Sequence, residues 1–209
     1  ISFNVCDGLL APPFILFFLL FFKFLTTLFL GFFNLDFLVF LFLPMLHSAQ
    51  QLRVDTENSH ISYEASHPVH DWSGTSKAVQ GVVILEKDIP KRIAIATGIS
   101  SFNSKNSNRD AHALEVLDAL RFPKVSFYSD DMILNDGTLT LSGALKFHGV
   151  SIPLKTVASW AKRQDNWILE GEFNVKPSAF NIKLPSFMLV KMRDNMRIRF
   201  RLELRTFVP

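Results

Sequence analysis

The side chains best suited to chemistry in this sequence form a polar triplet near its middle. Arg109, Asp110 and His112 lie within four consecutive positions. At the mouth of an apolar pocket, Arg109 or His112 could hydrogen-bond the polar end of a bound molecule. Asp110 has a competing interpretation, because Ser107 three residues before it completes a capping-box pattern for a helix N-terminus. Arg109 and His112 are equally compatible with a surface pair, and we assign no catalytic residue to this group.

Two further histidines, His67 and His70, are three positions apart. That spacing would place two ligands on one face of a helix, but Pro68 between them argues against a helix there. A metal site would need other histidines to converge on this pair, and no spacing in the sequence supports such a group. We therefore expect no metal site. The other histidines considered are His60, His112 and His148.

A histidine, a carboxylate and a hydroxyl also occur together at His70, Asp71 and Ser73. These are the residue types of a nucleophilic hydrolase. The sequence has no G-x-S-x-G segment that would present a serine on a strand-to-helix turn. A hydrolase or other enzyme that acts on a hydrophobic substrate, with His70 or His112 as acid or base, is therefore an alternative hypothesis only.

The polar triplet falls in a segment with helical signals. Leucine and valine side chains recur on one side over about three turns, which predicts a short amphipathic helix. Pro123 ends the pattern and biases Phe122 toward an extended backbone, and a strand opens at Val125. We expect the helix to lie on an apolar surface as a lid or flank. Its apolar residues are Leu114, Val116, Leu117 and Leu120.

The rest of the chain after residue 49 has the pattern of β-structure. Short segments rich in valine, isoleucine, threonine and aromatic residues alternate with turn residues at intervals of about ten positions. Turns are expected at 88–90 and at Asn135-Asp136-Gly137, which is typical of a tight hairpin, and 70–76 is expected to be a polar loop. After a first extended piece from Val54, we expect strands at 61–65, 81–85, 92–97, 125–134, 138–147, 152–160, 167–175 and 197–205.

Strict alternation marks the final strand. Its apolar residues, from Ile198 to Leu204, alternate with charged ones, so one face is dry and the other is wet. Strands of about ten residues are about 30 Å long at about 3.3 Å per residue. Eight or so antiparallel strands of this length with one short inserted helix suit an all-β fold, an extended, lipocalin-like closed barrel with an apolar lumen. A two-sheet sandwich has the same alternation and is the alternative architecture.

Residues 1–49 form a hydrophobic leader that we set apart from the fold. One interpretation is a cleaved secretory signal, with Lys23 as its positive region and cleavage before Gln50. The other is an uncleaved membrane anchor, because 14–33 is long enough to cross a bilayer of about 30 Å. Both make the domain at 50–209 periplasmic or secreted. The first methionine is Met45. We interpret the stretch before it as the result of a truncated fragment or of an over-extended reading frame.

Cysteine content and charge add little. Cys6 is the only cysteine and lies in the leader, so the domain depends on a hydrophobic core, for which about 160 residues suffice. The formal net charge of +3 is small. It argues neither for nor strongly against an anionic partner, and we expect no nucleic-acid partner.

One extended pattern is more specific than these general signals. Residues 106–127 combine Arg109-Asp110, His112, Glu115 and the run Leu117-Asp118-Ala119 with Pro123 before a Val-Ser-Phe strand. Together with 61–72, 79–85, 139–153 and 179–198, this segment resembles the YceI-like family of exported lipid-binding proteins. The similarity covers 59–207. It departs from the family pattern at Lys146-Phe147-His148, where the family commonly has Thr-Ile-Arg.

The resemblance implies an eight-stranded antiparallel barrel that holds a polyisoprenoid, quinone-like or other long-chain lipid, without a metal or redox cofactor. We expect the protein to sequester or transport such a lipid and not to be an enzyme. In this hypothesis Arg109 and His112 lie near the polar head group. The side chains expected to line the lumen are Phe102, Phe127, Phe147, Trp167, Phe173 and Phe200.

Two further hypotheses remain open. The aromatic residues can be plain core, in which case a solid barrel would act as a structural or stress-response module of the cell envelope. The arginines of the final strand indicate first a solvated face, and an exported lipid-handling protein could also use them to approach an anionic membrane.

Overall fold

The structure is a computed structural model that describes residues 23, 50–187 and 190–207. The expected leader, apart from Lys23, lies outside the described residues, so neither interpretation of it is decided. Within the described part of the chain, no helix is both long enough and apolar enough to cross a membrane.

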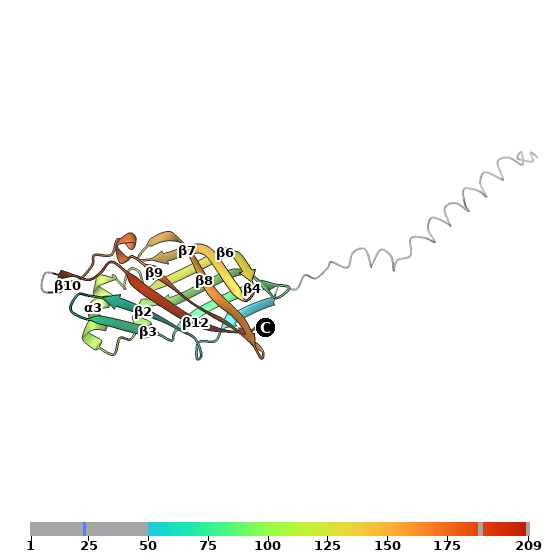
Figure 1. Cartoon of the computed structure of the whole chain (residues 1–209), viewed down its shortest axis with the longest axis horizontal. Coiled ribbons are helices and arrows are strands. Elements are labelled where there is room, and N and C mark those ends of the chain that lie inside the picture. Colours follow the sequence, from blue (N-terminus) through green and yellow to red (C-terminus); the bar gives the residue numbers. More distant parts are fainter. Residues whose placement is uncertain (1–22, 24–49, 188–189, 208–209) are drawn as a thin grey trace, which may run out of the picture. The chain divides into compact units, whose positions relative to one another are not determined.

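The strands form one antiparallel barrel (Figure 1). Around its wall the order is β1-β4-β5-β6-β7-β8-β9-β12, and pairing of β12 with β1 closes the ring. A hairpin, β2-β3, extends from β12, and a two-stranded ribbon, β10-β11, lies apart from the barrel sheet. The strands are β1 Gln50–Val54, β2 His60–Ser66, β3 Asp71–Ser76, β4 Val79–Glu86, β5 Ile89–Gly98, β6 Lys124–Asn135, β7 Thr138–Phe147, β8 Val150–Arg163, β9 Asn166–Val175, β10 Ser186–Phe187, β11 Val190–Lys191 and β12 Met196–Thr206; the helical segments are η1 Ile99–Ser101, α3 Ser107–Val116 and η2 Pro177–Phe180.

Strand β12 pairs with two different strands along one edge. Its residues 196–201 pair with β2, whereas residues 204–206 pair with β1. β1 and β2 therefore occupy one position in the wall, interrupted at 55–59, and β3 and β4 occupy the next, interrupted at 77–78. With each interrupted pair counted as one long strand, the wall has eight positions, which confirms the predicted eight-stranded barrel.

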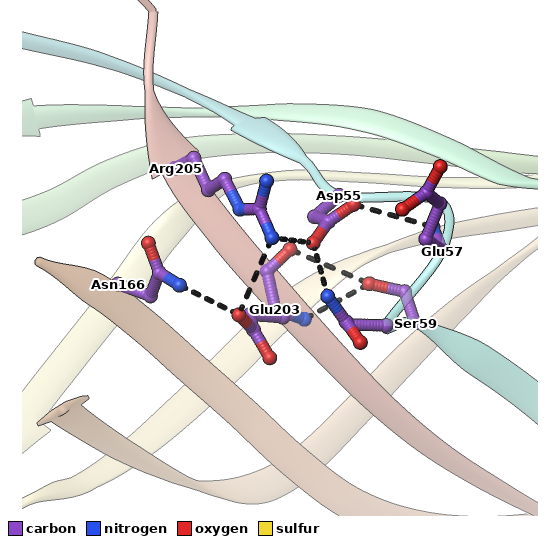
Figure 2. Close-up of polar contacts among 7 residues, drawn as sticks. Asp55, Glu57, Ser59, Asn166, Glu203 and Arg205 are labelled. Carbon is purple, nitrogen blue, oxygen red and sulfur yellow. Dashed lines mark hydrogen bonds and ion pairs between the residues drawn. The ribbon is translucent and has the colours of Figure 1, made fainter.

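A polar junction joins the first interruption to β12 (Figure 2). The Glu203 N–H donates to Ser59 Oγ at 2.9 Å, and the Asp55 N–H donates to the Glu203 carbonyl at 2.8 Å. These bonds satisfy backbone groups that would otherwise lose their partners where the ladder breaks. Arg205 pairs with Asp55 at 2.5 Å, and Asn166 Nδ2 donates to Glu203 Oε1 at 2.6 Å. The junction thus holds β1 and β2 in line along the same edge of β12.

One half of the barrel is solid. Inward-facing side chains from β1, β4, β5, β7, β8, β9 and β12 form a packed cluster there. Trp160 and Trp167 stack within it, with ring centroids 4.8 Å apart and planes 19° apart. Burial of such aromatic and aliphatic surface is the main stabilising term for a domain without disulfides. Its members include Leu52, Leu85, Ile93, Leu139, Trp160, Trp167, Leu169 and Leu204.

The other half is opened by two departures from regular pairing. β8 pairs with β9 only over 158–163, so its residues 150–157 lie beyond that ladder. Pro153 falls in this stretch, where a residue without an N–H is tolerated. η2 covers the opening, and its Phe180 is fully buried with its ring 5.4 Å from Phe147.

On the other side, β3 bridges to the segment after β5 at Thr75 and Asn103, and α3 follows that segment. In Figure 1, α3, β2, β3 and β10 gather at the same end of the barrel.

Three local predictions were wrong. The first extended piece was expected from Val54, but β1 ends at that residue. Residues 71–76 are strand β3 and not a polar loop, because the small residues Gly74 and Ser76 face inward and are buried. Gly74 is required there, since a Cβ would lie 2.5 Å from the Tyr63 ring. The turn between β4 and β5 is Lys87-Asp88, both with positive φ, so Ile89 and Pro90 already belong to β5.

Replacing Ser59 with alanine tests the junction. Ser59→Ala removes the acceptor of the Glu203 N–H in a buried position, so we expect a loss of about 1–3 kcal/mol in the free energy of unfolding, measured by urea denaturation. The control is Ser151→Ala at an exposed position of β8, for which we expect a change within about 0.5 kcal/mol. Equal denaturation midpoints for the two variants would show that the Ser59 bond does not contribute to the stability of the barrel.

Candidate functional site

The open half of the barrel contains a cavity of about 290 Å³, close to the lower end of the range for small-molecule sites. Its floor is shared with the packed half, because Leu141, Leu169 and Leu202 belong to both. Aliphatic and aromatic side chains make up most of the remaining lining. An apolar molecule therefore meets an apolar surface on nearly every side once it is inside. The aromatic lining includes Phe102, Phe127, Phe147, Phe173 and Phe200.

Helix α3 forms one wall of the cavity, and this wall carries the charged side chains Arg109 and Asp110. Its N-cap is Asn106, whose Oδ1 accepts the Arg109 N–H at 3.0 Å. The predicted capping box at Ser107 was therefore wrong by one position. The Asp110 carboxylate instead accepts the Ser104 N–H, at 3.1 and 3.2 Å to its two oxygens. Asp110 thus has a structural role in holding the loop before the helix.

The apolar side of α3 faces the cavity, but over a shorter length than predicted. Ala113, Leu114, Val116 and Leu117 line it. Leu120 does not, and its side chain is fully exposed. The physical reason is that the helix ends at Val116 and Asp118 has a φ of 44°, which turns the chain away before Leu120.

Tyr63 marks a polar corner of the cavity. Burial raises the pKa of its hydroxyl above the ordinary value of 10.0; nearby Asp110 raises it further, and Arg109 opposes the shift. The Tyr63 ring lies 5.7 Å from the Phe102 ring. The Arg109 guanidinium lies over the Trp72 ring at 5.9 Å, within reach of a cation–π attraction. The Tyr63 hydroxyl and the Arg109 guanidinium thus interact electrostatically along a lining that is mostly apolar.

The histidines do not converge on one point. His67 is buried; its Nδ1 accepts the Val69 N–H, so its Nε2 carries the proton and donates to the Val190 carbonyl at 2.9 Å. His148 Nδ1 donates to the Phe180 carbonyl at 2.9 Å. His112 pairs with Glu115 at 3.5 Å on an exposed surface. Within the described ranges, no three histidine, cysteine or carboxylate residues are grouped to hold a metal.

The sequence model of the YceI-like domain matches residues 52–204, which is most of the chain and all but the ends of the barrel. The chain belongs to the YceI-like family. The predicted resemblance is therefore confirmed.

Curated relatives and solved structures agree with this assignment. Protein YceI of Salmonella newport (strain SL254) is 24% identical over 149 residues, covering 64% of this chain and 77% of the relative. BcnA of Burkholderia cenocepacia superposes with a TM-score of 0.66 at 18% identity, covering 72% of this chain and 98% of that one. A polyisoprenoid binding domain from Saccharophagus degradans superposes with a TM-score of 0.62 at 11% identity, covering 75% and 98%. At these identities the structures establish a shared fold.

In this YceI-like barrel, most of the residues predicted for the site surround the cavity. Arg109, His112 and the five phenylalanines Phe102, Phe127, Phe147, Phe173 and Phe200 all line it. Trp167 does not, which corrects its predicted place in the lumen. It lies in the packed half against Trp160, because β9 starts at the solid end of the barrel.

The sequence reasoning missed the polar corner. Tyr63 has the same parity as Ile61 and Ala65 in β2, so alternation alone could have placed it inside. Trp72 was assigned to a loop, which hid its inward direction. Both side chains line the cavity. Neither Tyr63 nor Trp72 is close in sequence to α3. The pairing of β2 with β3 is what brings Tyr63 and Trp72 near each other.

Filling the cavity from α3 tests whether it takes up apolar molecules. In Ala113→Trp, an indole ring occupies space at a lining position, so we expect the affinity for N-phenylnaphthylamine, measured by its fluorescence, to fall by about tenfold or more, which is about 1.4 kcal/mol. Ala111→Trp adds the same ring at an exposed position of α3 and should bind as the unmodified protein does. Equal losses in both variants would contradict uptake at this cavity.

The buried hydroxyl of Tyr63 predicts a pH dependence. Because its pKa is raised above 10.0 in the folded state, the folded protein keeps a proton that the unfolded chain loses near pH 10. Its contribution to stability is therefore complete below pH 10 and is lost as the pH rises through the folded pKa. Tyr128 is the second of two tyrosines, so Tyr128→Phe leaves Tyr63 as the single tyrosinate signal. We expect that signal to appear above pH 10, and a midpoint at or below 10 would contradict its burial.

Proposed function

We propose that this protein binds a polyisoprenoid, quinone-like or similar long-chain lipid in the open half of its barrel and sequesters or carries it, without catalysing a reaction. One observation carries the proposal: one half of the barrel is filled by a packed apolar cluster, and the other half holds a cavity whose lining is mostly apolar. The similar fold from Saccharophagus degradans is a polyisoprenoid binding domain, which supports the same ligand class.

The apolar lining would supply most of the affinity. Removing an alkyl or isoprenoid tail from water contributes about 0.8 kcal/mol for each buried CH₂. The floor formed by Leu141, Leu169 and Leu202 limits how far a tail can enter. The ligand would therefore extend from this floor toward α3 and the open end.

The polar head would lie at the corner formed by Tyr63, Trp72 and Arg109. In this arrangement the Tyr63 hydroxyl and the Arg109 guanidinium hydrogen-bond the head group, and the Trp72 ring packs beside it. His112 lies farther out on the same helix and would contact the solvent-exposed part of the ligand. These four residues, with the five lining phenylalanines, form the proposed binding site.

We further propose that the protein is exported, to the periplasm or outside the cell, with residues 1–49 as its targeting segment or anchor. The domain at 50–209 carries no cysteine, so its stability depends on the packed apolar cluster and not on disulfides.

The enzyme hypothesis has less support. His70 is exposed and lies beside Trp72, with 5.6 Å between the ring centroids. His112 is also exposed and pairs with Glu115, so neither proposed acid–base histidine is buried. The envelope-module hypothesis required a solid barrel, and the cavity argues against it.

Extraction and mass spectrometry test the proposed function. We expect the full chain, purified from a cell envelope fraction, to release an apolar lipid in a stoichiometric amount. The Ala113→Trp variant should release much less, and Ala111→Trp should release as much as the unmodified chain. An unmodified chain that is folded but yields no lipid under these conditions would overturn the proposal.

A further inference from the structure

We propose that the open end of the barrel docks on an anionic membrane surface through a cationic rim formed by Lys176, Lys183, Lys191 and Arg193. This inference goes beyond the proposed function, because it concerns an outer surface and does not depend on which lipid fills the cavity.

The segment that carries the rim is amphipathic across the cavity mouth. Ile182, Leu184 and Met192 line the cavity, whereas their neighbours Lys183, Lys191 and Arg193 are exposed. Backbone bonds hold this arrangement: the Met192 N–H donates to the Pro185 carbonyl at 3.0 Å, and the Arg193 N–H donates to the Ser66 carbonyl at 2.8 Å. The same short segment thus covers the cavity with its apolar side and presents cations to the outside.

Two exposed apolar side chains accompany these cations. Val69 and Val190 are 63% and 44% exposed. The buried His67 ring links the backbones of these two valines, because it accepts the Val69 N–H and donates to the Val190 carbonyl. A membrane surface offers anionic head groups to the cations and an interfacial region to the apolar pair. A soluble anionic partner would leave the two valines without a role.

Few carboxylates compete within the rim. Asp194, the acidic residue of 176–194, accepts bonds from the Ser178 N–H and hydroxyl and also interacts with the charge of Lys176. Asp71 borders the rim, because it pairs with Ser66, whose carbonyl accepts the Arg193 N–H. At the opposite end of the barrel, each of the three hairpin turns carries an exposed carboxylate. These are Asp88, Asp136 and Asp165.

The arginines of β12 are a poorer docking surface. Arg197 and Arg199 pair with Glu64, Arg199 also pairs with Glu172, and Arg201 pairs with Glu170. Carboxylates therefore neutralise this outer wall along its length. The rim lies where a lipid would enter or leave the cavity, so its charge complementarity to an anionic surface would act at that point.

A fluorescent label tests docking on the full chain. Cys6 is the only cysteine, so Cys6→Ser allows one environment-sensitive label at Val190→Cys or, as the control, at Asp136→Cys in an opposite turn. With vesicles of phosphatidylcholine containing about one-third phosphatidylglycerol, we expect a blue shift at position 190 and none at 136. Phosphatidylcholine alone, or high salt, should abolish the shift.

A pair of charge reversals separates the rim from general electrostatics. Lys183→Glu with Arg193→Glu should weaken the vesicle affinity reported at position 190 by about tenfold or more. Lys87→Glu with Lys91→Glu, at exposed positions of the opposite end, makes the same change in net charge and should alter the affinity by less than about twofold.

Three outcomes would overturn the docking proposal. They are no fluorescence shift at position 190, an equal shift at position 136, or equal losses of vesicle affinity for the two charge-reversal pairs. Lipid extracted from the same samples distinguishes the two proposals. Recovery of lipid without docking would overturn the rim alone, and docking without any lipid would overturn the proposed function alone.

Discussion

The pairing of β12 with two partners is the constraint on which the rest of the barrel depends. Because β12 pairs with β1 at one end and β2 at the other, the first wall strand must break between them, and Ser59 and Asp55 supply the backbone bonds lost there. A matching break separates β3 from β4. There Ser76 Oγ bonds to Thr97 Oγ1 at 2.9 Å and to Ser101 Oγ at 2.7 Å. The breaks let the β2-β3 hairpin diverge from the tighter ring below it.

This divergence explains why one protein contains both a solid core and a cavity. Where all eight wall positions pair, the barrel is narrow enough for side chains to fill it, and the stacked pair Trp160 and Trp167 lies in the packed cluster there. Where β3 leaves β5, and β8 leaves β9, the wall is wider and helical segments replace strand neighbours. α3 and η2 cover these openings without filling the interior. The solid half supplies stability, so the open half can stay hollow.

The covering segments also decide how the cavity meets its surroundings. α3 brings Arg109 to a corner that already holds Tyr63 and Trp72, and that corner is the most polar part of an apolar lining. The segment after η2 places cations outside and apolar side chains inside within a few residues. Ligand binding and surface docking are thus proposed for the same end of the molecule, and both follow from where the regular strand pairing stops.

The sequence by itself determined most of the strand pattern and the position of α3, whereas the choice of a barrel over a sandwich depended on the family resemblance. Alternation in β12 and the Pro123 stop are local signals, and local signals depend on neighbours a few positions apart. It also selected five phenylalanines that line the cavity, and for Phe173 and Phe200 the alternation of their strands predicts an inward side chain. It could not decide which inward positions lie in the hollow half: Trp167 and Phe173 share a strand and a parity, yet one is packed core and the other lines the cavity. That difference depends on how far each lies from the point where β8 and β9 separate, a long-range property of the wall. The meeting of Tyr63 and Arg109 was likewise decided only by the tertiary structure, since α3 and the β2-β3 hairpin are joined through the fold and not through the local sequence.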